Sequence, residues 1–137
     1  MGSHGSPGFE VRTHVRNGVA RLALVGELDM AAAPTAQDHL ARIANDGVTA
    51  VLLDLRDLTF MDSTGVHVFV DARDQAMQQG CRFAIVGVGG TPRMLLDITG
   101  TGDALIDDTE GKELIRRFTQ PEPDDRSPTE AMSVPDA

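Results

Sequence analysis

The chain has 137 residues, of which 41% are hydrophobic, and carries a formal net charge of −9 from 12 basic and 21 acidic residues. This length suits one domain of common size, and the hydrophobic share can bury a core without a disulfide or a metal. An acidic chain without Trp or Tyr repels phosphate backbones and offers bases little to stack on, which argues against direct nucleic-acid binding and favours a basic protein patch as the partner.

The first predicted element is an antiparallel hairpin. Residues 1–7 resemble an expression scar and are left out of the fold. Apolar and polar side chains alternate over residues 9–16, which is the period of a half-buried strand. Asn17 and Gly18 tolerate the positive φ of a tight turn, so residues 19–25 are expected to return as a second, more apolar strand.

Helices and buried strands alternate after this hairpin. A helical pattern between Pro34 and Gly47 precedes a continuous apolar strand at residues 49–55. A second helix opens with residues 62–65 and ends at Gly80. Four of its side chains are expected on the core side: Val66, Phe69, Val70 and Met77.

Four further elements are predicted before the tail. Residues 82–86 have the pattern of a buried strand, and a third helix over residues 91–99 ends at Gly100. Its inner side is expected to consist of Met94, Leu95 and Ile98. A short strand at residues 104–106 precedes a last helix over residues 109–118.

The order of elements is thus β-β-α-β-α-β-α-β-α. It predicts an α/β fold with a mostly parallel sheet of four to five strands, an N-terminal antiparallel hairpin and four helices. The domain is expected at residues 8–119, followed by a disordered acidic, Pro-rich tail at residues 120–137. With Cys81 as the only cysteine and no apolar run long enough to cross a bilayer, we expect a cytoplasmic protein without a disulfide, a zinc cluster or a membrane segment.

The segment from residue 53 to residue 66 carries the most functional information. A buried strand ends there, and after a short connection the residues DSTG at 62–65 begin a helix. Sites in α/β sheets gather beyond the carboxyl ends of strands, and a helix start offers free N–H groups. A phosphate on Ser63 would meet those donors, and Gly65 has no side chain to block them. Taken alone, however, the four residues are more typical of a plain helix cap.

Two motifs give these residues a context. The run TFMDSTGV at residues 59–66 resembles the signature of the anti-sigma factor antagonists, which are built on the STAS domain. The run GELD at residues 26–29 resembles the second landmark of that family, in the expected place after the hairpin. The resemblance extends from residue 9 to about residue 118 and implies the STAS-type fold.

The resemblance implies a partner-switching function. Ser63 stands where members of that family are phosphorylated by an anti-sigma factor that is itself a GHKL-type serine kinase. The unphosphorylated form would bind the anti-sigma factor and release a sigma factor, and a PP2C-type phosphatase would reset the switch. ATP would belong to the kinase, so no cofactor is expected in this chain, which would act as a monomer or weak dimer.

Neighbouring residues have functional and plain interpretations. Asp62 can orient the Ser63 hydroxyl or bind a kinase-held metal, or it can cap the helix. Thr64 can be a second phosphoacceptor or a helix-turn hydroxyl. The family match places Asp29 near the phosphorylation loop, although a cap or turn residue is its plain role. His67 and Val68 are expected to be exposed on the second helix and to contact the partner.

Other functions lack their required residues. A receiver domain could use Asp54 as its phosphoacceptor, but it needs an acidic pair after the first strand and a lysine after a late strand. A serine hydrolase of the α/β class needs a Gly-x-Ser-x-Gly elbow, which this sequence lacks. The glycine-rich residues 87–90 do not have the spacing of a phosphate-binding loop. We therefore do not expect an enzyme. The remaining alternative is a STAS scaffold or protein-interaction module that is never phosphorylated.

Overall fold

The N-terminal hairpin forms as predicted in the computed structural model, which describes residues 8–121. Strand β1 (Phe9–Arg16) pairs antiparallel with β2 (Val19–Leu28) along its whole length. Asn17 and Gly18 join them with φ values of 54° and 77°. Positive φ at both central residues is the geometry that matches the right-handed twist of a hairpin.

The rest of the described sheet is parallel and is built around β2. Strands β3 (Ala50–Asp54) and β5 (Arg82–Val86) extend it in the order β1-β2-β3-β5. Strand β4 (Leu58–Met61) lies off this path and pairs with the second half of β2, whose first half pairs with β3. The predicted α/β class, with a mostly parallel sheet and an antiparallel hairpin, is confirmed.

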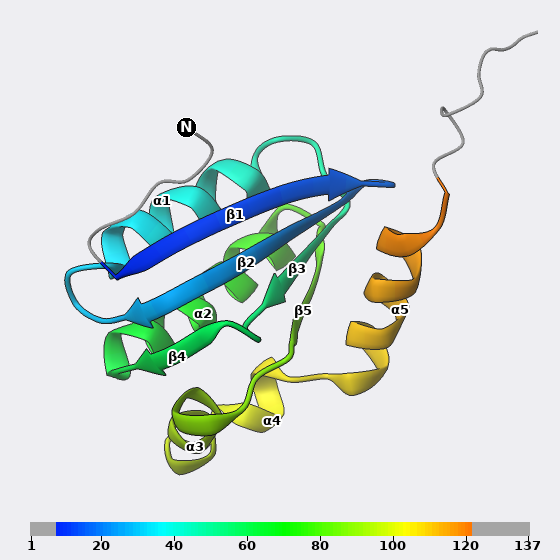
Figure 1. Ribbon diagram of the computed structural model, residues 1–137. Coiled ribbons are helices and arrows are strands. Elements are labelled where there is room, and N and C mark those ends of the chain that lie inside the picture. The colour runs from blue at the N-terminus through cyan, green and yellow to red at the C-terminus, as the bar shows by residue number, and fades with distance from the viewer. Residues whose placement is uncertain (1–7, 122–137) are drawn as a thin grey trace, which may run out of the picture.

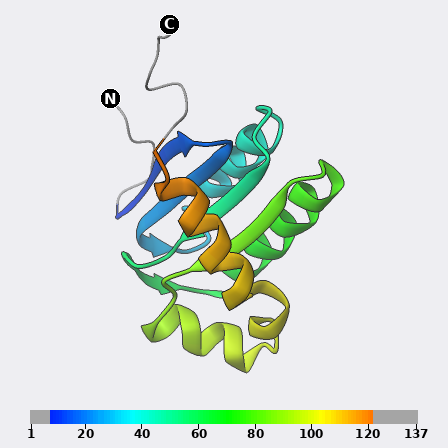
Figure 2. The same cartoon turned by 90° about the vertical axis from the view of Figure 1, so that its right-hand side faces the viewer.

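Helices cover both faces of the sheet. Helices α1 (Ala33–Ala44) and α2 (Ser63–Gln78) lie together behind it in Figure 1. Helix α5 (Asp108–Thr119) crosses the opposite face, as Figure 2 shows. Helix α3 (Gly90–Ile98) lies beside β4, and α4 (Gly102–Leu105) is a single turn after it. Four helices of the described chain thus have nine residues or more, as predicted.

Two predicted elements differ from the structure. The strand expected at residues 104–106 is wrong, because this segment forms α4 and the residue after it. The fifth strand is instead β4, in a segment that was expected to be a connection. The elements α4 and β4 have only four residues each, too few to show a helix period or a strand period. The expected scar at residues 1–7 and tail residues 122–137 lie outside the described residues, and the domain limits remain predictions.

The core has one part on each side of the sheet. The larger part lies between the sheet and helices α1 and α2, and includes Leu22, Leu53 and Phe69. The smaller part lies beneath α5 and includes Val19, Ala50, Leu52, Ala84 and Leu114. Arg82 of β5 donates to both carboxylate oxygens of Glu110 at 2.6 and 2.7 Å, which fastens α5 to the sheet.

Three apolar residues predicted to face the core do not. Met77 of α2 is 65% exposed, and Met94 and Ile98 of α3 are 57% and 74% exposed. Pro92 and Leu96 form the buried side of α3 instead. Each helix carries apolar residues on more than one side, so the period shows a helix but does not determine which side meets the sheet.

Gly26 allows β2 to change its pairing partner. Its φ is +100°, the register between β2 and β4 shifts at this residue, and its N–H donates to the carbonyl of Asp57 at 3.0 Å. A Cβ here would collide with the carbonyl oxygen of Gly8, which accepts from the N–H of Glu27 at 2.9 Å. A glycine is therefore required for both conformation and space.

Replacing Gly26 tests this requirement. We expect Gly26→Ala to lower the free energy of unfolding by about 3 kcal/mol or more, because backbone strain and a backbone collision add together. Gly47→Ala is the matched control, since Gly47 has a φ of +79° but nothing near its missing Cβ. That control should cost only the strain, about 1–2 kcal/mol. Equal losses in urea unfolding of the two variants would contradict the proposed collision.

Candidate functional site

Two loops meet where β2 and β4 end. Both strands run toward the same edge of the sheet, where the β2–α1 loop and the start of α2 lie at the left of Figure 1. The backbone N–H of Asp62 donates to the carbonyl of Leu28 at 3.2 Å. The two sequence motifs, GELD and TFMDSTGV, are therefore adjacent in space because β4 pairs with β2.

Asp62 caps α2. It has extended backbone angles, and its Oδ1 accepts from the backbone N–H of Thr64 at 2.9 Å. The Thr64 hydroxyl donates to the same oxygen. This hydroxyl hydrogen bond is the main cause that lowers the pKa of Asp62 below its ordinary value. Partial burial acts in the opposite direction, while backbone N–H groups, including that of Met30, lower the pKa further.

Ser63 is the first residue of α2 and is exposed. Its hydroxyl makes no hydrogen bond to any residue within 8–121. The neighbouring polar side chains are occupied with each other, because Thr64 bonds to Asp62 and Asp62 caps the helix. The arrangement leaves one hydroxyl at the helix start accessible to another protein.

Gly65 has a packing role that the sequence did not indicate. It is buried, and a Cβ at this position would lie 3.1 Å from Cβ and Sδ of Met61 and 3.2 Å from a methyl group of Leu28. Its N–H already donates to the carbonyl of Asp62 at 3.0 Å. The missing side chain therefore lets the first turn of α2 pack closely on β4 and β2, and the expected role of Gly65 beside a phosphate stays a prediction.

Asp29 lies in the adjoining loop and stabilises its turn. Its Oδ1 accepts from the N–H of Ala32 at 3.0 Å, and its carbonyl accepts from Ala32 and Ala33 just before and at the start of α1. The hydrogen bond between Asp62 and Leu28 brings the segment that contains Asp29 beside Asp62. The Asp29 carboxylate itself stabilises the turn before α1.

The expected pairing of His67 and Val68 on one partner-facing surface is wrong. His67 is exposed, one helical turn after Ser63 and on the same side of α2. Val68 is 1% exposed and belongs to the core beneath α1 and α2. Helix α1 packs along α2, so the buried side of α2 is wider than a sheet alone would require and includes Val68.

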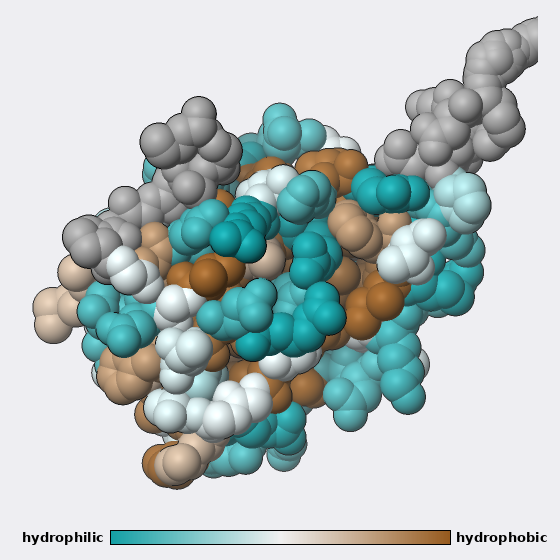
Figure 3. Space-filling view, viewed as in Figure 1, coloured by the Kyte–Doolittle hydropathy of each residue, from teal (hydrophilic) through white to brown (hydrophobic). Residues whose placement is uncertain are grey.

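Two exposed apolar residues near Ser63 were not found from the sequence. Met30 is 73% exposed in the loop whose backbone approaches Asp62, and Phe60 is 41% exposed on β4. In the view of Figure 1, Figure 3 shows brown hydrophobic groups scattered among teal residues, including some at the lower end over α3. Phe60 lies within the motif, but its exposure depends on β4 forming an edge of the sheet.

The part of the chain that the structure describes holds no group of three or more His, Cys, Asp or Glu side chains arranged to bind a metal ion. Within the same residues, none of the helices combines the length and apolar character needed to span a bilayer.

The pKa of Asp62 offers a test of the cap. Thr64→Val removes the main hydrogen bond to the carboxylate, so we expect the pKa of Asp62 to rise toward its ordinary value. A carboxyl whose pKa is lowered in the folded state stabilises the fold above its unfolded-state pKa, and this stabilisation is lost as pH falls through the folded-state pKa. Because the folded-state pKa is higher in Thr64→Val, the stabilisation from Asp62 should be lost at a higher pH than in the wild type. Carbon-13 NMR titration of the carboxyl measures the shift. Thr109→Val, at an exposed position of α5, is the control. An unchanged Asp62 titration in Thr64→Val would contradict the assignment.

Known proteins resemble this chain in sequence and in fold. The STAS domain model matches residues 10–113. The anti-sigma-B factor antagonist of Staphylococcus aureus is 29% identical over 106 residues, which cover 77% of this chain and 97% of that protein.

Two solved structures share the fold. An anti-sigma factor antagonist from Mycobacterium paratuberculosis superposes with a TM-score of 0.70 at 19% identity, over 85% of this chain and 100% of that one. SpoIIAA in its unphosphorylated form gives a TM-score of 0.64 at 21% identity, over 82% and 99% of the two chains, and it has also been solved in its phosphorylated form. The family model covers most of the domain, and the chain belongs to the STAS domain family.

Proposed function

We propose that this protein is an anti-sigma factor antagonist whose partner binding is switched off by phosphorylation of Ser63. The observation that carries the proposal is the exposed Ser63 at the first residue of α2, within the family motif. The similarity to a named anti-sigma-B factor antagonist supports the same role. In this proposal the unphosphorylated protein binds an anti-sigma factor and thereby releases a sigma factor.

The local geometry suits a kinase substrate. A kinase must reach the acceptor hydroxyl, and Ser63 is exposed. The rigid cap formed by Asp62 and Thr64 holds the backbone on both sides of it. We assign the kinase activity to a GHKL-type anti-sigma factor and the reverse reaction to a PP2C-type phosphatase. The nucleotide then belongs to the kinase, and this chain supplies only the acceptor.

Charge provides the switch. A phosphoryl group adds nearly two negative charges at neutral pH, beside an Asp62 carboxylate whose lowered pKa keeps it ionised. The N–H groups of Thr64 and Gly65 already bond to Asp62, so they do not neutralise the new charge. An interface closing over this charge without a matching cation would lose several kcal/mol. No large movement of the fold is needed.

The surface around Ser63 fits a protein partner. Exposed Met30, in the loop whose backbone approaches Asp62, and exposed Phe60, on the strand that leads to the acceptor, provide apolar contact area. His67 continues the surface along α2. Such a mixture of apolar and polar groups is typical of the centre and rim of a transient interface. We propose these three residues as partner contacts, in place of the buried Val68.

Phosphorylation can be tested directly. Incubation with candidate GHKL kinases and ATP should add about 80 Da, the mass of one phosphate, to the intact protein. Ser63→Ala should abolish this addition, while Thr64→Val should retain it because the Thr64 hydroxyl is engaged with Asp62. Ser63→Asp should weaken binding to the anti-sigma factor about a hundredfold or more, which corresponds to about 2.7 kcal/mol. Ser63→Ala should still bind.

If calorimetry shows that folded Ser63→Asp binds the anti-sigma factor with wild-type affinity, the proposed switch is contradicted. A stable complex that transfers no phosphate would instead favour the scaffold alternative.

The contact surface has its own test. Met30→Gln should weaken binding to the anti-sigma factor about tenfold, because a flexible apolar side chain at the interface is lost. Met77→Gln is the matched control, since Met77 is 65% exposed near the other end of α2. Equal affinities of the two variants would exclude Met30 from the interface.

A further inference from the structure

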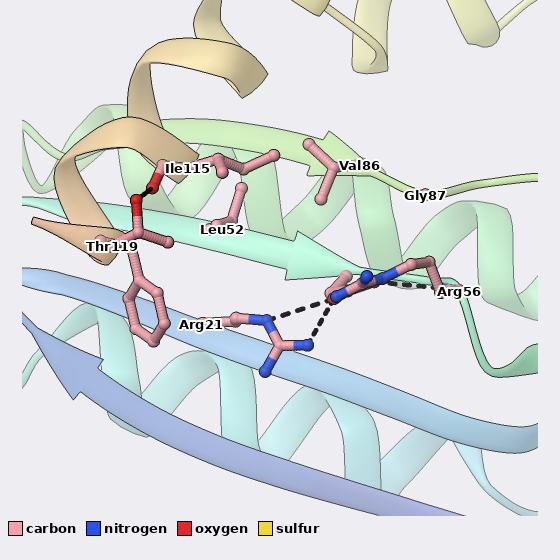
Figure 4. A pocket seen from close by; sticks show the side chains of 9 residues that line it. Arg21, Leu52, Arg56, Val86, Gly87, Ile115 and Thr119 are labelled. Atoms are coloured by element: carbon pink, nitrogen blue, oxygen red, sulfur yellow. Dashed lines mark hydrogen bonds and ion pairs between the residues drawn. The ribbon is translucent and has the colours of Figure 1, made fainter.

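A cavity lies on the face of the sheet opposite α1 and α2. It has a volume of about 380 Å³ and opens between α5 and the ends of β3 and β5. Figure 4 shows Ile115 and Thr119 projecting from α5 on one side, with Arg21 of β2 and Arg56 after β3 pointing toward each other at the other. Nothing in the Ser63 switch uses this cavity.

The polar end is built around a buried carboxylate. Asp54 is 3% exposed and is the only charged side chain in the core of the described residues. Its Oδ2 accepts from Arg21 Nη2 at 2.5 Å and from Arg56 Nη2 at 2.8 Å. Burial raises the pKa of Asp54, but the hydrogen bonds from Arg56 and Arg21 outweigh it, and the pKa lies below its ordinary value. The carboxylate is ionised and fully paired.

Among the residues that line the cavity, two cations share this one anion, so the lining carries a net positive charge. The Asp57 carboxylate is close enough to act on Arg56 but does not line the cavity. Each arginine directs its Nε and Nη2 to Asp54, and the Nη1 of each makes no hydrogen bond within residues 8–121. A guanidinium offers five N–H donors, so both retain donors for another acceptor. The arginine side chains are 25% and 68% exposed, which leaves them accessible from solvent.

The opposite walls are apolar. Leu52 and Val86 line the cavity from the sheet, and Ile115 and Phe118 line it from α5. An adjoining smaller hollow shares Val86, Gly87 and Ile115, and its charged residues are Arg93, Lys112 and Asp108. Small-molecule sites typically combine apolar walls with a few placed polar groups, in volumes from about 300 Å³ upward.

Gly87 preserves the shape of the cationic end. Its φ is +73°, and a Cβ here would collide with Cγ of Arg56 and lie 3.1 Å from Oδ1 of Asp54. The Arg56 side chain therefore lies directly over the glycine backbone, where any larger residue would displace it. This close approach holds the guanidinium against Asp54 and beside the apolar walls.

We propose that this cavity binds a small amphipathic carboxylate, with its head on Arg21 and Arg56 and its hydrocarbon chain between α5 and the sheet. A carboxylate matches the planar donor fork of a guanidinium, and an apolar chain matches the remaining walls. The net positive charge of the lining would repel a cation, and a fully polar anion would make no favourable contact with the apolar walls.

Decanoate is a suitable probe of the full chain. Amide shifts in a nitrogen-15 NMR titration should saturate and should map to the ends of β3 and β5 and to α5. Decyltrimethylammonium, which has an unbranched alkyl chain of similar length and the opposite charge, should not saturate this site. Arg56→Gln should weaken decanoate binding about tenfold or more. Arg42→Gln, which removes an exposed cation paired to Asp38 on α1, should leave it unchanged.

A second variant keeps the test independent of the Asp54 ion pairs. Ile115→Trp fills the cavity from the 41% exposed Ile115 and should abolish saturable binding, while the fold is checked by the unchanged amide spectrum of the hairpin. Equal binding of the cationic probe would overturn the proposal, as would amide shifts confined to other elements or full affinity in both variants. Phosphorylation of Ser63 is read out separately by mass, so either proposal can fail alone.

Discussion

The functional end of the molecule depends on the way β2 divides its hydrogen bonds between two neighbours. Its first half pairs with β3, and from Gly26 onward it pairs with β4. This change is possible because Gly26 adopts a positive φ and has no Cβ to meet the Gly8 carbonyl. Once β4 lies beside β2, the carbonyl of Leu28 meets the N–H of Asp62, and the two family motifs form one surface.

The same division creates the second site. Since β3 stops pairing with β2 at Asp54, the chain turns away there, and Arg56 folds back onto the Asp54 carboxylate. Arg21 reaches that carboxylate from β2. The acceptor serine and the cationic cavity therefore follow successive strands, β4 and β3, but the cavity lies under α5 on the other face. The change of pairing partner along β2 therefore positions both sites.

Much of this could be predicted from local patterns. The hairpin follows from Asn17 and Gly18, and the start of α2 follows from the capping residues at 62–64, because these signals act through backbone bonds within a few residues. The burial of Val68 and the exposure of Met77 could not be predicted, because they depend on where α1 packs along α2. The packing role of Gly65 could not be predicted either, because it depends on Met61 and Leu28 lying where a Cβ would be.

By itself, the sequence determined the α/β class, the family motifs and the place of Ser63 at a helix start. Those properties depend on period, turn chemistry and capping, which are encoded by residues close together in the chain. Only the tertiary structure decided that the Met30 loop lies beside Asp62, that Phe60 is exposed, and that two arginines share Asp54. These contacts join residues from separate strands and loops, and their geometry exists only after the sheet has formed and its two faces are covered.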